Sequence, residues 1–282
     1  MIAIIALMIR FTLALVLASV CQAQTNAQVY QPASGPAKGS LIVVGGGSVG
    51  NDILERFAKL AGGYDAPIVV IPTAGDPDSY PANYLETFML KRAGFTNLTM
   101  MHTRDRAEAN TENFAAPLKG AKGVWLSGGR QWRLVDSYLH TRTHRELDAL
   151  LERGGVIAGS SAGASIQASY MVRGARENNT VMMAKGYEEG FGFLRPVAVD
   201  QHLIARKREN DMVSVIAARP DLLGIGIDEA TAIEVHGATF EVLGVSKVAI
   251  YDMNTPGQDG KAYYWLKAGD KFDMQSRKKI SR

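Results

Sequence analysis

Near-continuous apolar runs alternate with amphipathic segments from Gly39 onward, and this alternation limits the fold more than any other feature of the chain. The apolar runs have the length and composition of strands, and they lie at 40–44, 67–71, 97–102, 123–126 and 156–158. Helical segments separate them, at 52–60, 82–93, 113–118 and 131–152. Buried strands joined by helices are typical of a parallel sheet. We therefore predict an α/β protein with a mostly parallel sheet flanked by helices.

The last hundred residues are richer in β-structure. Strands are predicted there at 180–183, 223–227, 230–235, 240–243 and 247–251. The sequence shows no internal repeat and no linker, so we predict one α/β domain over residues 39–282. The net charge of +3 is small and dispersed, and no Lys/Arg run alternates with aromatic residues. This pattern argues against a nucleic-acid partner.

The first 23 residues have the pattern of a secretory signal peptide. An apolar core at 11–20 follows Arg10, and Cys21 and Ala23 fit the small-x-small cleavage pattern. We expect cleavage after Ala23, a flexible leader at 24–38, and a secreted or periplasmic protein without a stable membrane span. A lipid or uncleaved anchor is the alternative, and Met8 would also serve as a start.

Cysteine chemistry is excluded if that cleavage occurs, because Cys21 is the only cysteine. The mature chain would then hold no disulfide, no cysteine nucleophile and no cysteine-based metal site. His140 and His144 are four residues apart, but no carboxylate completes a His-Glu-x-x-His signature, so a solvated helix face is favoured. We expect neither a metal nor a cofactor.

Turns rich in Gly and Ser follow three of the predicted strands, at 45–47, 127–129 and 159–163. Ligands of parallel sheets bind beyond the carboxyl ends of the strands, so the three turns indicate one shared site. The last turn has the Gly-x-Ser-x-Gly pattern, with Ser161 between a strand and a predicted helix at 164–170. This order is typical of a nucleophile elbow, and an ordinary strand-to-helix turn is the alternative.

A nucleophilic serine needs a histidine base and a carboxylate that orients it. His202 is the best placed of the five histidines, because it follows an apolar strand and lies in a polar cluster. Asp228 and Glu229 lie between two apolar strands, where an acidic pair costs desolvation free energy unless a charge offsets it. The alternative is that Asp228 and Glu229 lie exposed in a β-turn. The order Ser161, His202, Glu229 differs from that of the α/β-hydrolases, in which the acid precedes the histidine.

Together these motifs resemble the cyanophycinase and peptidase E family, serine peptidases with a class I glutamine-amidotransferase-like fold. The resemblance extends from about residue 39 to 251 and is carried by 45–47, 126–131, 159–165, 200–202 and 224–229. It implies a flavodoxin-like sheet, with Ser161 as nucleophile, His202 as base and Glu229 as the acid that orients His202. It also implies an oxyanion hole formed by Gly128, Gly129 and the N–H of Ala162.

The resemblance is closer to the cyanophycinase branch, which cleaves β-linked aspartyl-arginine polymer. The residues that match its substrate-binding positions are Gln131, Asp200, Gln201, Arg206 and Arg208. Guanidinium groups suit a carboxylate, and acidic side chains suit an arginine or amino group of the substrate. Asp211 occupies the third position of the expected Arg-x-Arg-x-x-Arg series and reverses its charge.

The sequence thus predicts a secreted serine exopeptidase of cyanophycinase type, which hydrolyses β-aspartyl (isopeptide) or aspartyl peptides through an acyl-enzyme. A non-catalytic secreted binding protein on the same fold is one alternative. A dinucleotide-binding protein is the other, because residues 45–50 match Gly-x-Gly-x-x-Gly, although no acidic residue ends the second strand. The oligomeric state is left open, with a homodimer among the options.

Overall fold

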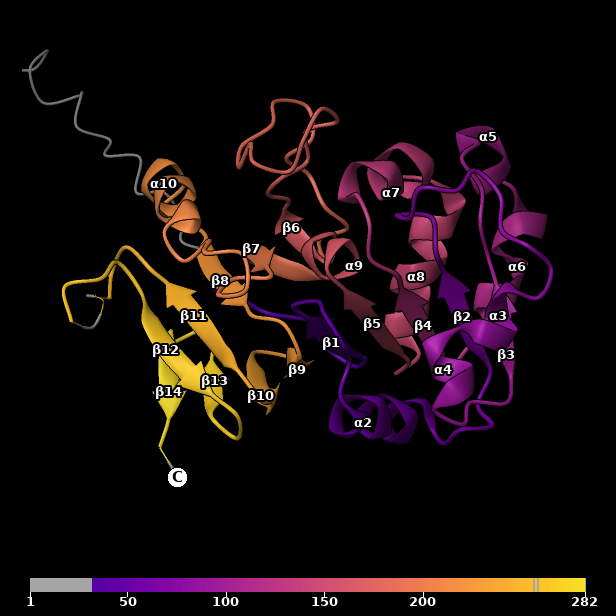
Figure 1. The fold of residues 1–282 in the computed structure, drawn as a ribbon, viewed down its shortest axis with the longest axis horizontal. Coiled ribbons are helices and arrows are strands. Elements are labelled where there is room, and N and C mark those ends of the chain that lie inside the picture. The colour runs from indigo at the N-terminus through magenta and orange to yellow at the C-terminus, as the bar shows by residue number, and fades with distance from the viewer. Residues whose placement is uncertain (1–31, 256, 258, 282) are drawn as a thin grey trace, which may run out of the picture. The chain divides into compact units, whose positions relative to one another are not determined.

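Two sheets with flanking helices make up the protein (Figure 1). The structure is a computed structural model, and it describes residues 32–255, 257 and 259–281. The signal-peptide pattern and the first part of the leader lie outside these residues. Among the described residues, no helix is long and apolar enough to cross a bilayer.

The larger sheet has nine strands among the described residues, in the order β14–β13–β10–β9–β1–β5–β4–β2–β3. Neighbours from β1 through β5, β4 and β2 to β3 are parallel, and the remaining neighbours are antiparallel. The bounds are Ser40–Val44 (β1), Ile68–Ile71 (β2), Leu98–Met100 (β3), Gly123–Leu126 (β4), Val156–Ser160 (β5), Thr231–His236 (β9), Thr239–Gly244 (β10), Lys271–Asp273 (β13) and Lys278–Ile280 (β14).

The second sheet has the order β12–β11–β8–β7–β6. Strands β6, β7 and β8 are parallel neighbours, and β11 and β12 extend the sheet in antiparallel fashion. The bounds are Ala168–Tyr170 (β6), Leu194–Gln201 (β7), Leu223–Ile227 (β8), Lys247–Tyr251 (β11) and Tyr264–Lys267 (β12). The predicted α/β fold with a β-rich C-terminal part is confirmed.

Helices cover both faces of the larger sheet because its central strands are apolar on both sides. In β1, Ile42 packs in the cluster that contains Phe57 of α2, whereas Leu41 packs in the cluster that contains Leu147 of α8. Successive side chains of a strand point to opposite faces, which explains this division. The helices are Asn51–Ala61 (α2), Tyr84–Thr87 (α3), Met89–Arg92 (α4), Arg106–Ala109 (α5), Glu112–Gly120 (α6), Gln131–Tyr138 (α7), Arg142–Glu152 (α8), Ala162–Ser165 (α9) and Asp211–Ala218 (α10).

The predicted helix at 131–152 is two helices, α7 and α8, and the break has a tertiary cause. Arg106 donates hydrogen bonds to the carbonyl oxygens of Val135, Asp136 and Leu139, so the end of α7 is capped by a distant side chain. His140 follows with φ +62°. No glycine or proline interrupts 131–152, so the sequence carries no local signal for this break.

Other local predictions were wrong in extent. The segment at 164–170 divides into the end of the short helix α9 and strand β6, and residues 180–183 form irregular chain with a bend instead of a strand. The described part of the predicted flexible leader is docked instead of free. Ser34 pairs with Arg195 of β7 in an antiparallel bridge, and the side chain of Ala33 is fully buried.

Candidate active site

Ser161 lies at a sharp turn between β5 and α9, with φ +56° and ψ −111°. A residue other than glycine rarely has a positive φ, and such strain persists only where the surrounding structure enforces it. Glycines make the turn possible: a Cβ on Gly163 would lie 2.1 Å from the Leu126 carbonyl oxygen, and one on Gly159 would lie 2.1 Å from the carbonyl oxygen of Gly163. The N–H of Ser161 donates to the Val44 carbonyl at 3.0 Å. The segment has the geometry of a nucleophile elbow.

His202 directly follows β7 and connects Ser161 to Glu229. Its Nε2 is 2.8 Å from Oγ of Ser161, and its Nδ1 is 2.5 Å from Oε1 of Glu229. A carboxylate at Nδ1 fixes the ring proton there, so Nε2 accepts the hydrogen bond from the serine hydroxyl. The N–H of His202 donates to the Gly45 carbonyl at 2.8 Å. Three side chains from the ends of β5, β7 and β8 thus form one serine–histidine–carboxylate series.

The surroundings of His202 keep its imidazole neutral at neutral pH. Burial lowers the pKa of His202 below its usual 6.5, the hydrogen bond and charge of Glu229 raise it in part, and the Arg206 and Arg208 guanidinium groups lower it further. A neutral imidazole with a free Nε2 lone pair can accept the proton of a serine hydroxyl.

The glycine run after β1 packs against this series. A Cβ on Gly46 would lie 2.2 Å from Cε1 of His202, and one on Gly47 would lie 2.7 Å from Oε2 of Glu229. Both glycines have positive φ, at +114° and +67°. The run makes room for the imidazole and the carboxylate, which accounts for the glycine pattern without a bound pyrophosphate.

The turn after β4 lies beside Ser161. A Cβ on Gly128 would lie 3.3 Å from Cβ of Ser161. Gly129 has φ +139°, and a Cβ there would lie 2.0 Å from the Ala74 carbonyl oxygen. Among the described residues, the N–H groups of Gly128 and Gly129 have no backbone acceptor, and Ala162 follows the serine at the start of α9. Unpaired N–H groups next to a nucleophile suit an oxyanion.

Asp228, next to Glu229 in sequence, has a different task. Its Oδ1 accepts hydrogen bonds from the N–H groups of Ile204 and Ala205 at 2.9 and 3.0 Å, and its Oδ2 accepts one from Ser246 at 2.6 Å. Burial raises the pKa of Asp228, but these hydrogen bonds outweigh burial and lower it overall. Asp228 therefore fixes the turn that begins at His202.

Gln201, Arg206 and Arg208 cluster next to His202. Arg206 is exposed and makes no ion pair with any described residue. Arg208 is only 7% exposed, and its Nη1 donates to Oε1 of Gln201 at 3.0 Å. Burial lowers the pKa of the Arg208 guanidinium. The two arginines supply positive charge beside the imidazole.

Gln131 and Asp200 are buried and bonded to the chain itself. Nε2 of Gln131 donates to the Val172 carbonyl at 2.8 Å. Asp200 is 0% exposed, and both of its carboxylate oxygens accept hydrogen bonds from Arg173. In this structure Arg173 therefore occupies the Asp200 carboxylate that the family resemblance assigns to the substrate.

Residues 41–243 match the model of peptidase family S51. The chain belongs to this family. It is 35% identical over 223 residues to the cyanophycinase of Synechococcus elongatus, and the aligned region covers 76% of this chain and 68% of the relative. It is 34% identical over 227 residues to the cyanophycinase of Trichormus variabilis, with 76% and 74% covered.

Solved peptidase structures share this fold. A peptidase from an acI-B1 actinobacterium superposes with a TM-score of 0.64 at 25% identity, over 85% of this chain and 98% of that one. A putative peptidase E from Listeria monocytogenes shares the fold, with a TM-score of 0.53 at 16% identity over 74% and 100%. The chain is a serine-type peptidase of the cyanophycinase-like S51 family.

Arg173 was not among the residues predicted for the site of this S51 peptidase. It follows β6 with φ +57°, is 1% exposed, and lies between Asp200 and Asp211. The available signal was an arginine directly after the apolar residues Met171 and Val172, because a buried guanidinium requires carboxylate partners.

A second serine–histidine–glutamate series occurs at the opposite end of β1. Oγ of Ser40 is 2.9 Å from Nδ1 of His236, whose Nε2 is 2.6 Å from Oε1 of Glu234. Ser40 lies in a regular strand instead of an elbow, about 13 Å along β1 from Val44. This series lacks the strained turn that exposes a nucleophile.

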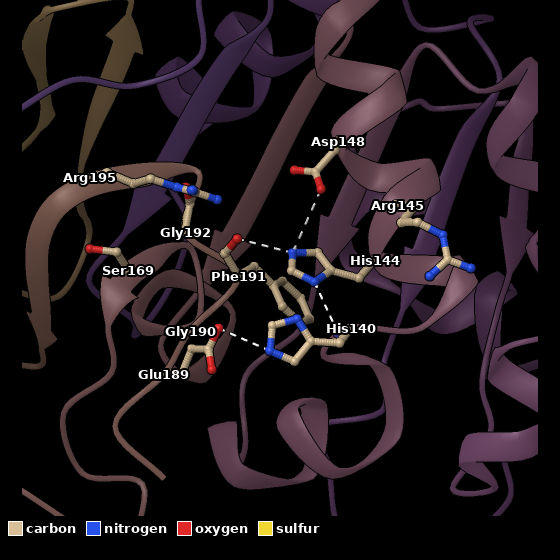
Figure 2. A pocket seen from close by; sticks show the side chains of 10 residues that line it. All are labelled: His140, His144, Arg145, Asp148, Ser169, Glu189, Gly190, Phe191, Gly192 and Arg195. Atoms are coloured by element: carbon tan, nitrogen blue, oxygen red, sulfur yellow. Dashed lines mark hydrogen bonds and ion pairs between the residues drawn. The ribbon is translucent and has the colours of Figure 1, made fainter. Parts of the chain in front are cut away.

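His140 and His144 line a cavity of about 460 Å³ that contains none of the three residues of the Ser161 series (Figure 2). The predicted solvated helix face was wrong for His144, which is buried: its Nδ1 accepts from the N–H of His140, and its Nε2 donates to the Phe191 carbonyl. His140 pairs with Glu189 at 3.0 Å. Both nitrogens of His144 are thus engaged, and no described group of three or more candidate ligands could hold a metal.

Proposed function

We propose that Ser161, His202 and Glu229 are the catalytic triad of a secreted serine exopeptidase that hydrolyses β-aspartyl (isopeptide) or aspartyl peptides. The hydrogen-bonded series from the elbow serine through the histidine to the glutamate carries this proposal. Membership of the S51 family and the cyanophycinase relatives support it.

Acylation begins when Oγ of Ser161 attacks the substrate carbonyl carbon and transfers its proton to Nε2 of His202. Glu229 stabilises the imidazolium that results. The carbonyl oxygen becomes an oxyanion, and we assign the N–H groups of Gly128, Gly129 and Ala162 as its hydrogen-bond donors. Collapse of this intermediate breaks the C–N bond, and the leaving amine takes the proton from Nε2.

Deacylation repeats these steps with water as the nucleophile. His202 takes a proton from the water as it attacks the ester, and the acid product leaves when Oγ of Ser161 recovers its proton. Arg206 and Arg208 favour a carboxylate on the substrate, since guanidinium groups bind carboxylates with charge-assisted hydrogen bonds.

Two serine variants test the triad. Ser161→Ala should lower kcat by roughly a thousandfold or more, because the residues of a triad act as a unit. Ser40→Ala is the matched control, since Ser40 belongs to the other serine–histidine–glutamate series, and it should keep full activity. Labelling by a serine-directed phosphonate, located by mass spectrometry, should occur at Ser161. Labelling or loss of activity at Ser40 instead would refute the assignment.

Substrate class is tested with matched compounds. Mature protein is incubated with cyanophycin, β-Asp-Arg, other isoaspartyl peptides and α-aspartyl dipeptides, and the products are read by mass spectrometry. Cleavage of neutral peptides in preference to all of these compounds would contradict the proposed aspartyl specificity, but it would be consistent with the serine mechanism.

Secretion is proposed from the pattern of residues 1–23. N-terminal sequencing of protein recovered from the periplasm or medium of an expressing bacterium should find Gln24 as the first residue. Recovery of the full-length chain from the cytoplasm alone would contradict this proposal.

A further inference from the structure

Asp211 stands where the family resemblance implies an arginine, and its surroundings give this acidic residue a defined position. It is the first residue of α10, and its Oδ2 accepts a hydrogen bond from Nη2 of Arg173 at 2.7 Å. Arg173 follows β6, and Asp200 of the neighbouring strand β7 accepts hydrogen bonds from it through both carboxylate oxygens. Figure 1 shows β6 and β7 side by side. The charge reversal at 211 is therefore accompanied by a buried arginine that reaches it from another strand.

Every nitrogen of the Arg173 guanidinium is already bonded within the chain. Its Nε and Nη2 donate to the two oxygens of Asp200 at 2.7 and 2.8 Å, and its Nη1 donates to the Asn179 carbonyl at 2.9 Å. Burial lowers the pKa of Arg173, but its two carboxylate partners outweigh burial and raise it overall. Arg173 thus acts as a fixed support for the Asp211 carboxylate.

The contact with Arg173 engages only one of the two carboxylate oxygens of Asp211. Its side chain is 41% exposed, and Oδ1 accepts no hydrogen bond from any described residue. A carboxylate held through one oxygen presents the other in a defined direction, and this preorganisation favours binding of a cation.

Arg208 provides the opposite charge nearby. It is as buried as a core residue, yet no carboxylate of the described chain lies within ion-pair distance, and among described residues only its Nη1 finds an acceptor. The N–H of Asp211 donates to the Arg208 carbonyl at 3.0 Å, and Arg173 bonds both Asp200 and Asp211, so the three groups lie close together. Gln201, the acceptor for Arg208, directly precedes His202. A guanidinium without a carboxylate within ion-pair distance and a carboxylate oxygen without a hydrogen-bond donor therefore both lie in the segment that directly follows His202, whose turn is closed by the N–H of Arg206 bonding the His202 carbonyl and the N–H of Arg208 bonding the Leu203 carbonyl.

Building on the proposed peptidase function, we propose that Asp211 determines specificity by binding a cationic group of the substrate while Arg206 and Arg208 bind its carboxylate. A substrate with both charges satisfies both groups, and a substrate without the cation leaves Asp211 unpaired. The cation has two chemical sources in a β-aspartyl peptide, the α-ammonium group of the aspartyl residue and a guanidinium group of the attached residue.

Three substrates and one substitution separate these sources. β-Asp-Arg carries both cations, N-acetyl-β-Asp-Arg lacks the ammonium, and β-Asp-citrulline lacks the guanidinium. Asp211→Asn keeps the shape of the side chain and removes its charge, and Asp221→Asn, on a carboxylate paired with Arg219, is the control. In Asp211→Asn we expect kcat/KM to fall about 10- to 100-fold for the substrates that carry the cation which Asp211 binds. For the substrate that lacks this cation, kcat/KM should change less than about threefold, because neither the wild-type protein nor Asp211→Asn can then form the charge-assisted hydrogen bond.

The pattern of losses identifies the bound cation. A loss of kcat/KM on β-Asp-Arg and β-Asp-citrulline identifies the α-ammonium group as the cation that Asp211 binds. A loss of kcat/KM on β-Asp-Arg and N-acetyl-β-Asp-Arg identifies the guanidinium group. An equal loss on all three substrates would show a structural role only, and no loss on any would show that Asp211 does not contact the substrate. Either of these last two results overturns the proposal.

Failure of the proposed function is a separate result. It is recognised when the wild-type protein hydrolyses none of the three compounds. In that case calorimetry on Ser161→Ala, with and without Asp211→Asn, measures the Kd values of the same compounds. A selective loss of affinity for cation-bearing compounds supports the role of Asp211 in binding, and equal or undetectable binding overturns it.

Discussion

The imidazole of His202 sets how activity depends on pH, because each of its nitrogens has one partner. Only the neutral ring accepts the serine proton, so kcat/KM should fall as the pH falls through the pKa of His202. Since burial lowers this pKa, the acid limb should lie below pH 6.5. Glu229→Gln removes the group that raises the pKa, so the limb should move to still lower pH while kcat falls about a thousandfold or more. A pH–rate profile checks both, and a limb that moves to higher pH contradicts the arrangement.

Asp228 and Glu229 are adjacent, but their substitutions should differ. Asp228→Ala removes the acceptor for the N–H groups of Ile204 and Ala205, which should cost about 1–3 kcal/mol of unfolding free energy and lower kcat through a displaced His202. Glu229→Gln should leave the unfolding free energy nearly unchanged, because that side chain is partly exposed. Urea denaturation with kcat measured in parallel separates the two. If Asp228→Ala leaves stability intact but abolishes turnover, Asp228 is the triad acid.

Among the elements, the turn after β1 is shaped to fit the site. Gly46→Ala places a Cβ 2.2 Å from Cε1 of His202, so the imidazole must move, and kcat should fall at least a hundredfold. Gly62→Ala is a matched control: Gly62 has φ +98°, and a Cβ there meets nothing within 4 Å. Both variants should lose about 1–2 kcal/mol of stability from backbone strain, but only Gly46→Ala should lose activity. Equal kcat values in the two variants would show that the glycine run does not set the position of His202.

At the scale of the whole molecule, residues 33–35, which precede β1, are part of the folded structure. Ser34 pairs with Arg195 through two backbone hydrogen bonds of 2.6 and 2.9 Å, Gly35 donates to the Gly237 carbonyl, and Ala33 is buried. A protein that starts at residue 39 should therefore melt roughly 3–10 °C below one that starts at residue 32. Differential scanning calorimetry of the two proteins tests this, and equal melting temperatures would mean that the docked segment contributes no stability.

Features that depend on neighbouring residues were predictable from the sequence. Val- and Ile-rich runs between helical segments indicated the α/β class, because strand and helix periodicity are local properties. Gly159 and Gly163 marked the turn at Ser161, since only glycine tolerates such close approach of the backbone. The serine, histidine and glutamate that the structure joins were selected from these signals together with the family resemblance.

Contacts between residues that are far apart in the sequence became visible only in the folded structure. Tertiary contacts end α7 through Arg106, bury His144 against Phe191, dock Ser34 on β7, and join Arg173 to Asp200 and Asp211. The partners are far apart along the chain; Arg173 and Asp211, for example, are separated by 38 positions. No local pattern specifies such pairs, because their free energy arises when two surfaces exclude water together and leave buried charges only one another as partners.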